Sequence, residues 1–194
     1  MDDYYSPHPR MLLSEPLLLV GQVGSGTAHV ARAIAARTGI PFADIDRSVE
    51  NAAGCSLPQL VATEGLDALV RRSEHALERA LARRPCAVVA GGGATSTPEA
   101  MALAREQARI VYLRRPHAVL LRRILTQLEA QPGSLFQFAL ATPGTSEQLA
   151  PLFDALEPAL ASAHVILEAG DRHPHALSTE LIGALDRIAG AEPL

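Results

Sequence analysis

The stretch Leu17–Val30 reads LLLVGQVGSGTAHV. Its apolar start predicts a short buried strand, and the glycines that follow predict a tight turn into an alanine-rich helix. Gly21 and Gly26 have the spacing of the phosphate-binding pattern G-x-x-x-x-G-K-[ST]. Thr27, however, stands where that pattern has lysine, and Ala28 stands where it has the magnesium-binding serine or threonine. The motif is therefore a degenerate Walker A loop.

The backbone part of a phosphate site survives in this loop. Its glycines allow N–H groups to point inward, and the helix that follows adds the positive end of its dipole. Thr27 can donate one neutral hydrogen bond, about half as strong as a charge-assisted one, whereas Ala28 donates none. The candidate nucleotide-binding residues are Gly21, Gly24, Ser25, Gly26 and Thr27. A glycine-rich turn that binds nothing is the alternative, and the loop alone does not decide between the two.

Composition limits the classes of function. The chain has 194 residues, 48% of them hydrophobic, and a net charge of −4. We expect one globular domain, and the charge gives no electrostatic reason to expect nucleic acid or an anionic membrane as partner. Cys55 and Cys86 lack the spacing of metal ligands, which favours a reduced interior. The amino terminus lacks the basic start of a signal peptide, so we expect a soluble, cytoplasmic protein.

Short apolar strands and helices alternate along the chain, which predicts an α/β fold with a parallel sheet covered on both faces. The expected strands are 17–20, 41–45, 87–90, 109–113 and 164–167. The expected helices are 28–38, a short one capped by Ser56, 66–84, one that Thr97 caps, 116–130 and 175–188. Residues 1–15 predict a flexible leader before a domain over 16–190, and residues 131–147 predict a mobile lid.

Several motifs follow one another in a characteristic order. They are GQVGSG, PFADID, the residues around Arg71–Glu74, AVVAGGGA and IVYL. In this order and spacing the chain resembles the shikimate kinase family over roughly residues 16–190. The resemblance implies a three-layer P-loop fold like that of the nucleoside monophosphate kinases. Its parts would be a five-stranded parallel sheet, a substrate-binding arm and a flexible lid over ATP.

The resemblance assigns roles to two aspartates. Asp44 and Asp46 match the family's D-x-D after the second strand. Asp44 would order the water molecules of Mg²⁺, and Asp46 would contact the substrate hydroxyl and accept its proton as phosphate is transferred. The alternative is structural, because aspartates at this point also cap helices, here a helix beginning near Arg47.

Further matches concern substrate binding. Gly91, Gly92 and Gly93 match the family's triple glycine, whose backbone N–H groups approach the substrate. Arg71 matches the arginine that binds the substrate carboxylate, for which a guanidinium fork is suited. The interval before Arg71 is one residue longer than the family's, so Arg72 is a second candidate. A solvated helix face explains both arginines equally well.

The chain also departs from the family. Residues 124–171, which span the expected lid, contain no lysine or arginine, although the family carries arginines there. Only Arg122 and Arg123 lie nearby.

Three hypotheses about the function remain. The protein is a catalytically degraded shikimate-kinase-like protein that binds a small hydroxy acid, a nucleotide or a protein partner. Alternatively, it is an active shikimate kinase or related small-molecule kinase that uses ATP and Mg²⁺ at an altered phosphate site. Otherwise it is a scaffold or regulatory module.

Overall fold

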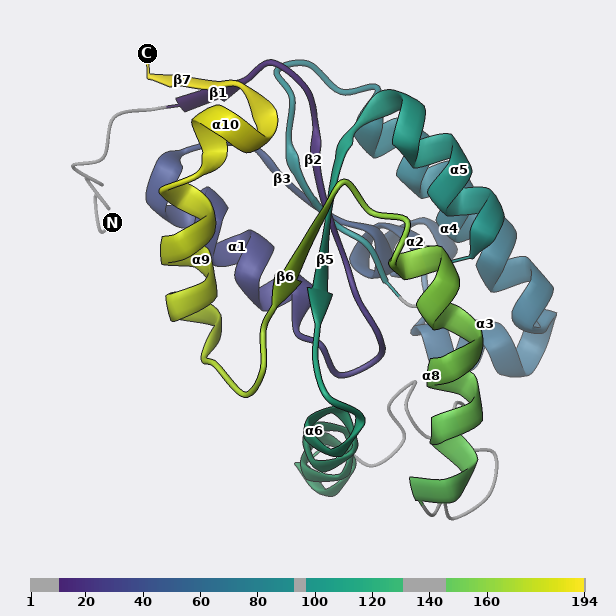
Figure 1. The fold of residues 1–194 in the computed structure, drawn as a ribbon. Coiled ribbons are helices and arrows are strands. Elements are labelled where there is room, and N and C mark those ends of the chain that lie inside the picture. Colours follow the sequence, from purple (N-terminus) through teal and green to yellow (C-terminus); the bar gives the residue numbers. More distant parts are fainter. Residues whose placement is uncertain (1–10, 93–96, 131–145, 194) are drawn as a thin grey trace, which may run out of the picture.

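A five-stranded parallel sheet forms the centre of the computed structural model, which describes residues 11–92, 97–130 and 146–193 (Figure 1). In spatial order its strands are β3 (Phe42–Asp44), β4 (Val88–Ala90), β2 (Leu17–Val20), β5 (Arg109–Arg114) and β6 (Val165–Glu168). A separate antiparallel pair joins β1 (Met11–Leu13) to β7 (Ala191–Pro193). The predicted α/β class with a five-stranded parallel sheet is confirmed.

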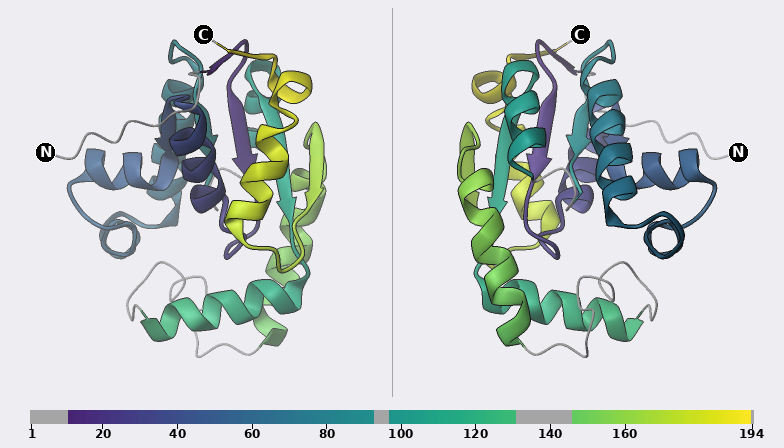
Figure 2. Two further views of the ribbon diagram at one scale, coloured as in Figure 1. Left: turned by 90° about the vertical axis from the view of Figure 1, so that its left-hand side faces the viewer. Right: turned by 90° about the vertical axis from the view of Figure 1, so that its right-hand side faces the viewer.

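Helices cover both faces of the sheet (Figure 1). On one face lie α1 (Thr27–Thr38), α9 (Pro174–Ile182) and α10 (Leu185–Ala189). On the other face lie α4 (Leu66–Leu81), α5 (Pro98–Gln107) and α8 (Ser146–Leu160). Beyond β3, α2 (Ile45–Ala53) and α3 (Leu57–Glu64) pack on α4. The remaining helix, α6 (His117–Ala130), crosses the edge of the sheet where the strands end (Figure 2).

Strand β2 is the centre of the core. It pairs with β4 on one side and β5 on the other, and all of its side chains are fully buried, because helices cover both faces of the sheet. Leu17 and Leu19 belong to the cluster under α1 and α9, whereas Leu18 and Val20 belong to the cluster under α4 and α5. Successive side chains of a strand point to opposite faces, so a continuous apolar run is what a central parallel strand needs. The loop after β2 therefore begins at a strand that is held firmly in the core.

The ends of the chain differ from the sequence predictions. Residues 11–13 of the expected flexible leader form β1, and residues 1–10 lie outside the described residues. Ser14 then bonds to the Ala189 carbonyl oxygen through its hydroxyl, at 3.0 Å. The expected closing helix, 175–188, is two helices that separate at Gly183. A strand pair between the two ends of a chain leaves no local periodicity, so the sequence pattern did not predict it.

The region of the expected lid is the other difference. Residues 131–145 lie outside the described residues, and residues 146 and 147 are the first of α8. Helix α8 was not among the expected helices, because Pro151 and Pro158 interrupt its pattern and proline disfavours a helix interior. Its buried residues Phe153 and Leu160 nevertheless hold it in the structure.

A buried arginine ties the loop after β2 to the loop between β6 and α9. Arg115 is only 3% exposed. Its Nε donates to the Ser25 carbonyl oxygen at 2.8 Å, and its Nη1 donates to the Gly170 carbonyl oxygen at 2.6 Å. Its Nη2 donates to the carbonyl oxygen of Arg172 at 3.2 Å. Burial and repulsion by Arg123 lower the pKa of Arg115 to about 10, so it stays charged at neutral pH.

We expect Arg115→Met to destabilise the fold. The substitution leaves buried carbonyl groups without their charged donor, which costs about 3 kcal/mol of unfolding free energy. Urea unfolding followed by circular dichroism measures this change. Arg79→Met, at an exposed position of α4, is the control and should stay within about 0.5 kcal/mol of the unaltered protein. Equal midpoints for the two variants would contradict the bracing role of Arg115.

Candidate functional site

The loop between β2 and α1 has the backbone of a phosphate-binding turn. Gly24 and Gly26 have φ angles of 84° and 83°, in the left-handed region that favours glycine. Gly26 is the N-cap of α1, and no described side chain caps this helix. The first N–H groups of α1 therefore face the loop as donors for an anion. Gly21 and Ser25 are buried beneath them.

Thr27, at the lysine position of the motif, is engaged in the fold. Its side chain is 9% exposed, and its hydroxyl donates to the Gly91 carbonyl oxygen at 3.3 Å. This bond joins the start of α1 to the end of β4. Ala28 beside it has no polar side-chain atom. The start of α1 thus offers its dipole to a phosphate but no lysine and no magnesium-binding hydroxyl.

Asp46 and Gly92 lie against each other at the next strand ends. Strands β3 and β4 are parallel neighbours with Asp44 opposite Ala90, so the residues that follow them meet at one edge. A Cβ on Gly92 would lie 1.8 Å from Asp46 Oδ1. Only glycine therefore fits beside this carboxylate, and the predicted approach of this backbone to a substrate stays a prediction. The third glycine, Gly93, lies outside the described residues.

The environment of Asp46 changes its acidity. Burial, followed by repulsion from the nearby carboxylates of Asp44 and Glu50, raises the pKa of Asp46 from 3.8 to about 6. At pH 7 the group is largely ionised, yet it binds a proton much more readily than a free aspartate does. A carboxylate with a pKa near the working pH is suited to accept a proton from a hydroxyl group.

Asp44 has a structural role, because it caps a helix. Its Oδ1 accepts a hydrogen bond from the Arg47 backbone N–H at 3.2 Å, which makes it the N-cap of α2. Its Oδ2 lies 3.7 Å from Nη2 of Arg32. Helix α2 begins at Ile45, before the expected start near Arg47, so Asp46 lies in its first turn. The capping alternative thus describes Asp44, and its role at Mg²⁺ stays a prediction.

The two arginines of α4 differ in their surroundings. Arg72 forms a two-pronged ion pair with Glu64, with Nη2 at 3.0 Å and 2.9 Å from the two carboxylate oxygens. Arg71 is exposed and forms no ion pair within the described residues. Because Arg72 is already paired, Arg71 is the better candidate to bind a substrate carboxylate.

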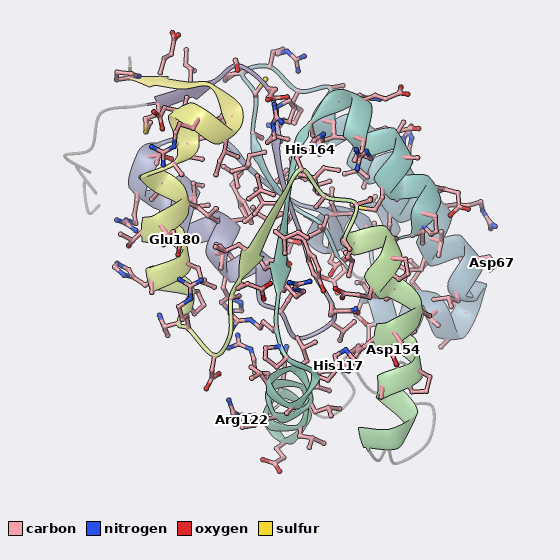
Figure 3. All side chains as sticks on the ribbon, in the orientation of Figure 1. Asp67, His117, Arg122, Asp154, His164 and Glu180 are labelled. Carbon is pink, nitrogen blue, oxygen red and sulfur yellow. The ribbon has the colours of Figure 1, made fainter. Side chains whose placement is uncertain are left out.

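Helix α6 carries two more arginines, one of which contacts the loop. Arg123 Nε donates to the Gly24 carbonyl oxygen at 2.9 Å, and its Nη2 lies 3.0 Å from the place of a Cβ on Gly26. Arg122, labelled in Figure 3, pairs with Asp171 at 2.6 Å. The sequence indicated both arginines only as nearby cations. It did not show that Arg123 contacts the loop, because a helical pattern does not reveal which element its exposed face meets.

A buried polar group behind the loop was also missed. The Gln22 amide Nε2 donates to the Phe153 carbonyl oxygen at 2.8 Å, which joins the loop to α8. The Tyr112 hydroxyl donates to Glu157 at 2.6 Å. Burial, followed by the bond to Glu157, raises the pKa of Tyr112 above its usual value. The Gln22 bond holds the loop to α8, as the Arg115 bond to Ser25 holds it to the end of β5.

The described residues contain no cluster of three or more histidine, cysteine, aspartate or glutamate side chains that could hold a metal ion. None of the described helices has the length and apolar character that crossing a membrane requires.

Comparison with known proteins agrees with this geometry. A sequence model of the shikimate kinase family matches residues 23–185. A shikimate kinase of Caulobacter vibrioides is 33% identical over 171 residues, which cover 88% of this chain and 82% of that protein. A shikimate kinase of Nitratidesulfovibrio vulgaris is 38% identical over 153 residues, which cover 77% of this chain and 85% of that protein.

A solved structure shows the same fold. The shikimate kinase from Acinetobacter baumannii, in complex with shikimate, superposes with a TM-score of 0.75 at 22% identity. The superposition covers 93% of this chain and 94% of that one. Because the family match spans most of the sequence and the fold agrees, this chain belongs to the shikimate kinase family.

Proposed function

We propose that this protein binds a small hydroxy acid in the acceptor half of a shikimate kinase site, and transfers phosphate from ATP far more slowly than a complete enzyme. One observation carries the proposal. The residue at the lysine position, Thr27, is neutral, and its hydroxyl is bonded to the Gly91 carbonyl oxygen. Phosphate transfer depends on cations that neutralise the phosphate chain, and this position supplies none.

The acceptor half keeps groups that suit a hydroxy acid. Asp46, whose carboxylate lies against Gly92, can accept a hydrogen bond from a hydroxyl. Arg71, which has no ion-pair partner among the described residues, suits a carboxylate. Shikimate, the ligand of the Acinetobacter baumannii structure, carries both groups and is the first ligand to test.

The known contribution of single cations to the rate favours slow phosphate transfer. A single cation that clamps the phosphates is worth about 10³–10⁵ in rate in related phosphoryl-transfer enzymes. Here the lysine and the magnesium-binding hydroxyl are replaced together, by Thr27 and Ala28. Such losses are not additive, but one of them alone is enough to remove ordinary turnover.

The second candidate function is an active small-molecule kinase that uses ATP and Mg²⁺. It is favoured by the pKa of Asp46, about 6, which suits a base at neutral pH. In that case ADP release would depend on Mg²⁺ and would be lost in Asp46→Asn.

Restoring the motif separates these candidates. We expect the unaltered protein, given ATP, Mg²⁺ and shikimate, to release ADP at background rate in a coupled assay. The double variant Thr27→Lys/Ala28→Ser should gain about tenfold or more, because it regains the lysine and the magnesium ligand. Turnover by the unaltered protein at about 1–100 per second, as in ordinary kinases, would reject the proposal.

Carboxylate binding distinguishes the two arginines of α4. Arg71→Gln should weaken shikimate binding by about tenfold or more in calorimetry, because it removes a charge-assisted pair. Arg72→Gln is the matched control, and it should stay within about threefold of the unaltered protein, because Arg72 is paired with Glu64. A larger loss of shikimate affinity in Arg72→Gln than in Arg71→Gln would show that Arg72 binds the carboxylate. If the unaltered protein does not bind shikimate, the scaffold hypothesis is favoured.

The raised pKa of Asp46 also predicts how stability depends on pH. The folded state binds the Asp46 proton more tightly than the unfolded state, where the pKa is near 3.8. The stability that this group contributes is therefore present below about pH 4 and is lost as the pH rises through about 6. Asp46→Asn should raise the thermal midpoint at pH 8 by about 2–4 °C, and should not raise it at pH 4.

Glu106→Gln, at an exposed position of α5, is the control for this measurement. Its thermal midpoint should differ little from that of the unaltered protein at both pH values. A midpoint of Asp46→Asn that falls at pH 8 would show that the Asp46 carboxylate stabilises the folded state, contrary to this account.

A further inference from the structure

We propose that Arg123 takes the part of the missing loop lysine and holds the phosphate chain of a nucleoside polyphosphate against the loop. The inference rests on the proposed function, in which the loop keeps its shape and loses its own cation. It adds that the cation comes from α6 instead of α1, so that a nucleotide binds without ordinary transfer.

The position of Arg123 is the first argument. Its Nε donates to the Gly24 carbonyl oxygen at 2.9 Å, and its Nη2 lies 3.0 Å from the place of a Cβ on Gly26. The guanidinium thus lies against Gly24 and Gly26, where a larger side chain at position 26 would displace it. A guanidinium has five N–H donors, and the Gly24 carbonyl oxygen takes one of them. The others can reach phosphate oxygens.

The packing of α6 fixes this position. A Cβ on Gly24 would lie 3.1 Å from Ile124 Cγ1 and 3.2 Å from the Leu120 carbonyl oxygen, so helix and loop are in direct contact. Leu120 and Ile124 are buried in one cluster with Phe153 of α8. Arg123 therefore sits on a helix held against the loop, and little conformational entropy remains to be lost when a phosphate binds.

Charge is the second argument. Arg122, the neighbour of Arg123 on α6, is neutralised by Asp171 at 2.6 Å. Arg123 has no such carboxylate partner among the described residues. Arg115 lies close enough to Arg123 for repulsion between them to lower its pKa, whereas Asp171 acts on Arg115 in the opposite direction and Arg172 is paired with Glu180. The charge of Arg123 beside helix N–H donors is the condition that attracts a polyphosphate.

The chemistry of the replacement explains why binding need not bring transfer. A guanidinium binds phosphate oxygens through paired hydrogen bonds and stays protonated, so it holds a phosphate chain well. It does not replace the hydroxyl that the motif uses for Mg²⁺, since Ala28 stands at that position. Arg123 thus restores the charge of the loop but not its metal ligand.

Calorimetry with ATP and Mg²⁺ tests the inference. Arg123→Gln should weaken ATP binding by about tenfold or more, because a charge-assisted contact with the phosphate chain is lost. Arg122→Gln is the matched control on the same helix and should stay within about threefold, because its charge is already paired with Asp171. AMP, which lacks the β- and γ-phosphates, should bind the unaltered protein and Arg123→Gln with similar affinity.

Two further variants separate a phosphate contact from a structural role. Thr27→Lys in the Arg123→Gln background returns a cation to the loop and should restore ATP binding, which it would not do if Arg123 only supported the fold. Arg123→Lys keeps the charge without the paired hydrogen bonds and the Nε contact, and should bind ATP more tightly than Arg123→Gln and more weakly than the unaltered protein. ATP binding by Arg123→Lys that is no tighter than that of Arg123→Gln would overturn the inference.

The outcomes distinguish this inference from the proposed function. If the unaltered protein does not bind ATP, or if Arg123→Gln binds it unchanged, the inference is rejected, and shikimate binding with slow turnover is untouched. If the unaltered protein turns over rapidly while Arg123→Gln loses ATP, the proposed function is rejected, and the role of Arg123 stands.

Discussion

The position of every candidate site group depends on the burial of β2 between β4 and β5. Its apolar side chains serve both core clusters, so the strand cannot slide or tilt without opening one of them. The loop after β2 is thereby held beside the ends of β4 and β3. This arrangement brings Thr27 to the Gly91 carbonyl oxygen and Asp46 to Gly92 at one edge of the sheet.

In the proposed function, the two halves of the site on this support differ in what they keep. The acceptor half keeps an acidic group that the fold holds at a cost, since burial raises the pKa of Asp46. Such a group is expected where a ligand, and not stability, selects the residue. In the phosphate half the loop keeps its shape, because Arg115 and Gln22 fix it from two sides. Its charge now comes from α6 through Arg123.

Local signals predicted much of the fold. The apolar run of β2 is encoded within a few residues, and so are two helix caps, Ser56 with its reciprocal Gln59 bond and Thr97. The structure confirms the strand and the two helices that these caps begin. Contacts between distant segments were not predictable in this way. The pairing of β1 with β7 spans nearly the whole chain, and α8 is held by buried contacts in spite of its prolines.

The candidate site shows the same division. The sequence predicted the loop and the aspartates, because spacing identifies them, and the structure places Asp46 beside Gly92. It left open whether Asp44 caps a helix and which arginine of α4 is available, since both depend on partners such as Arg47 and Glu64. The contacts of Arg115 and Arg123 with the loop depend on tertiary packing alone, and no sequence motif predicts them.

The central claim is that the acceptor half binds a hydroxy acid while the phosphate half transfers phosphate far more slowly than a complete enzyme. Titration calorimetry of shikimate into protein already saturated with ATP and Mg²⁺ tests both parts in one experiment. We predict a binding heat at each injection, followed by return to the baseline, because shikimate binds and is not consumed. A sustained heat flow after each injection would reveal continuing turnover, and the absence of any heat would show that shikimate does not bind; either result would contradict the account.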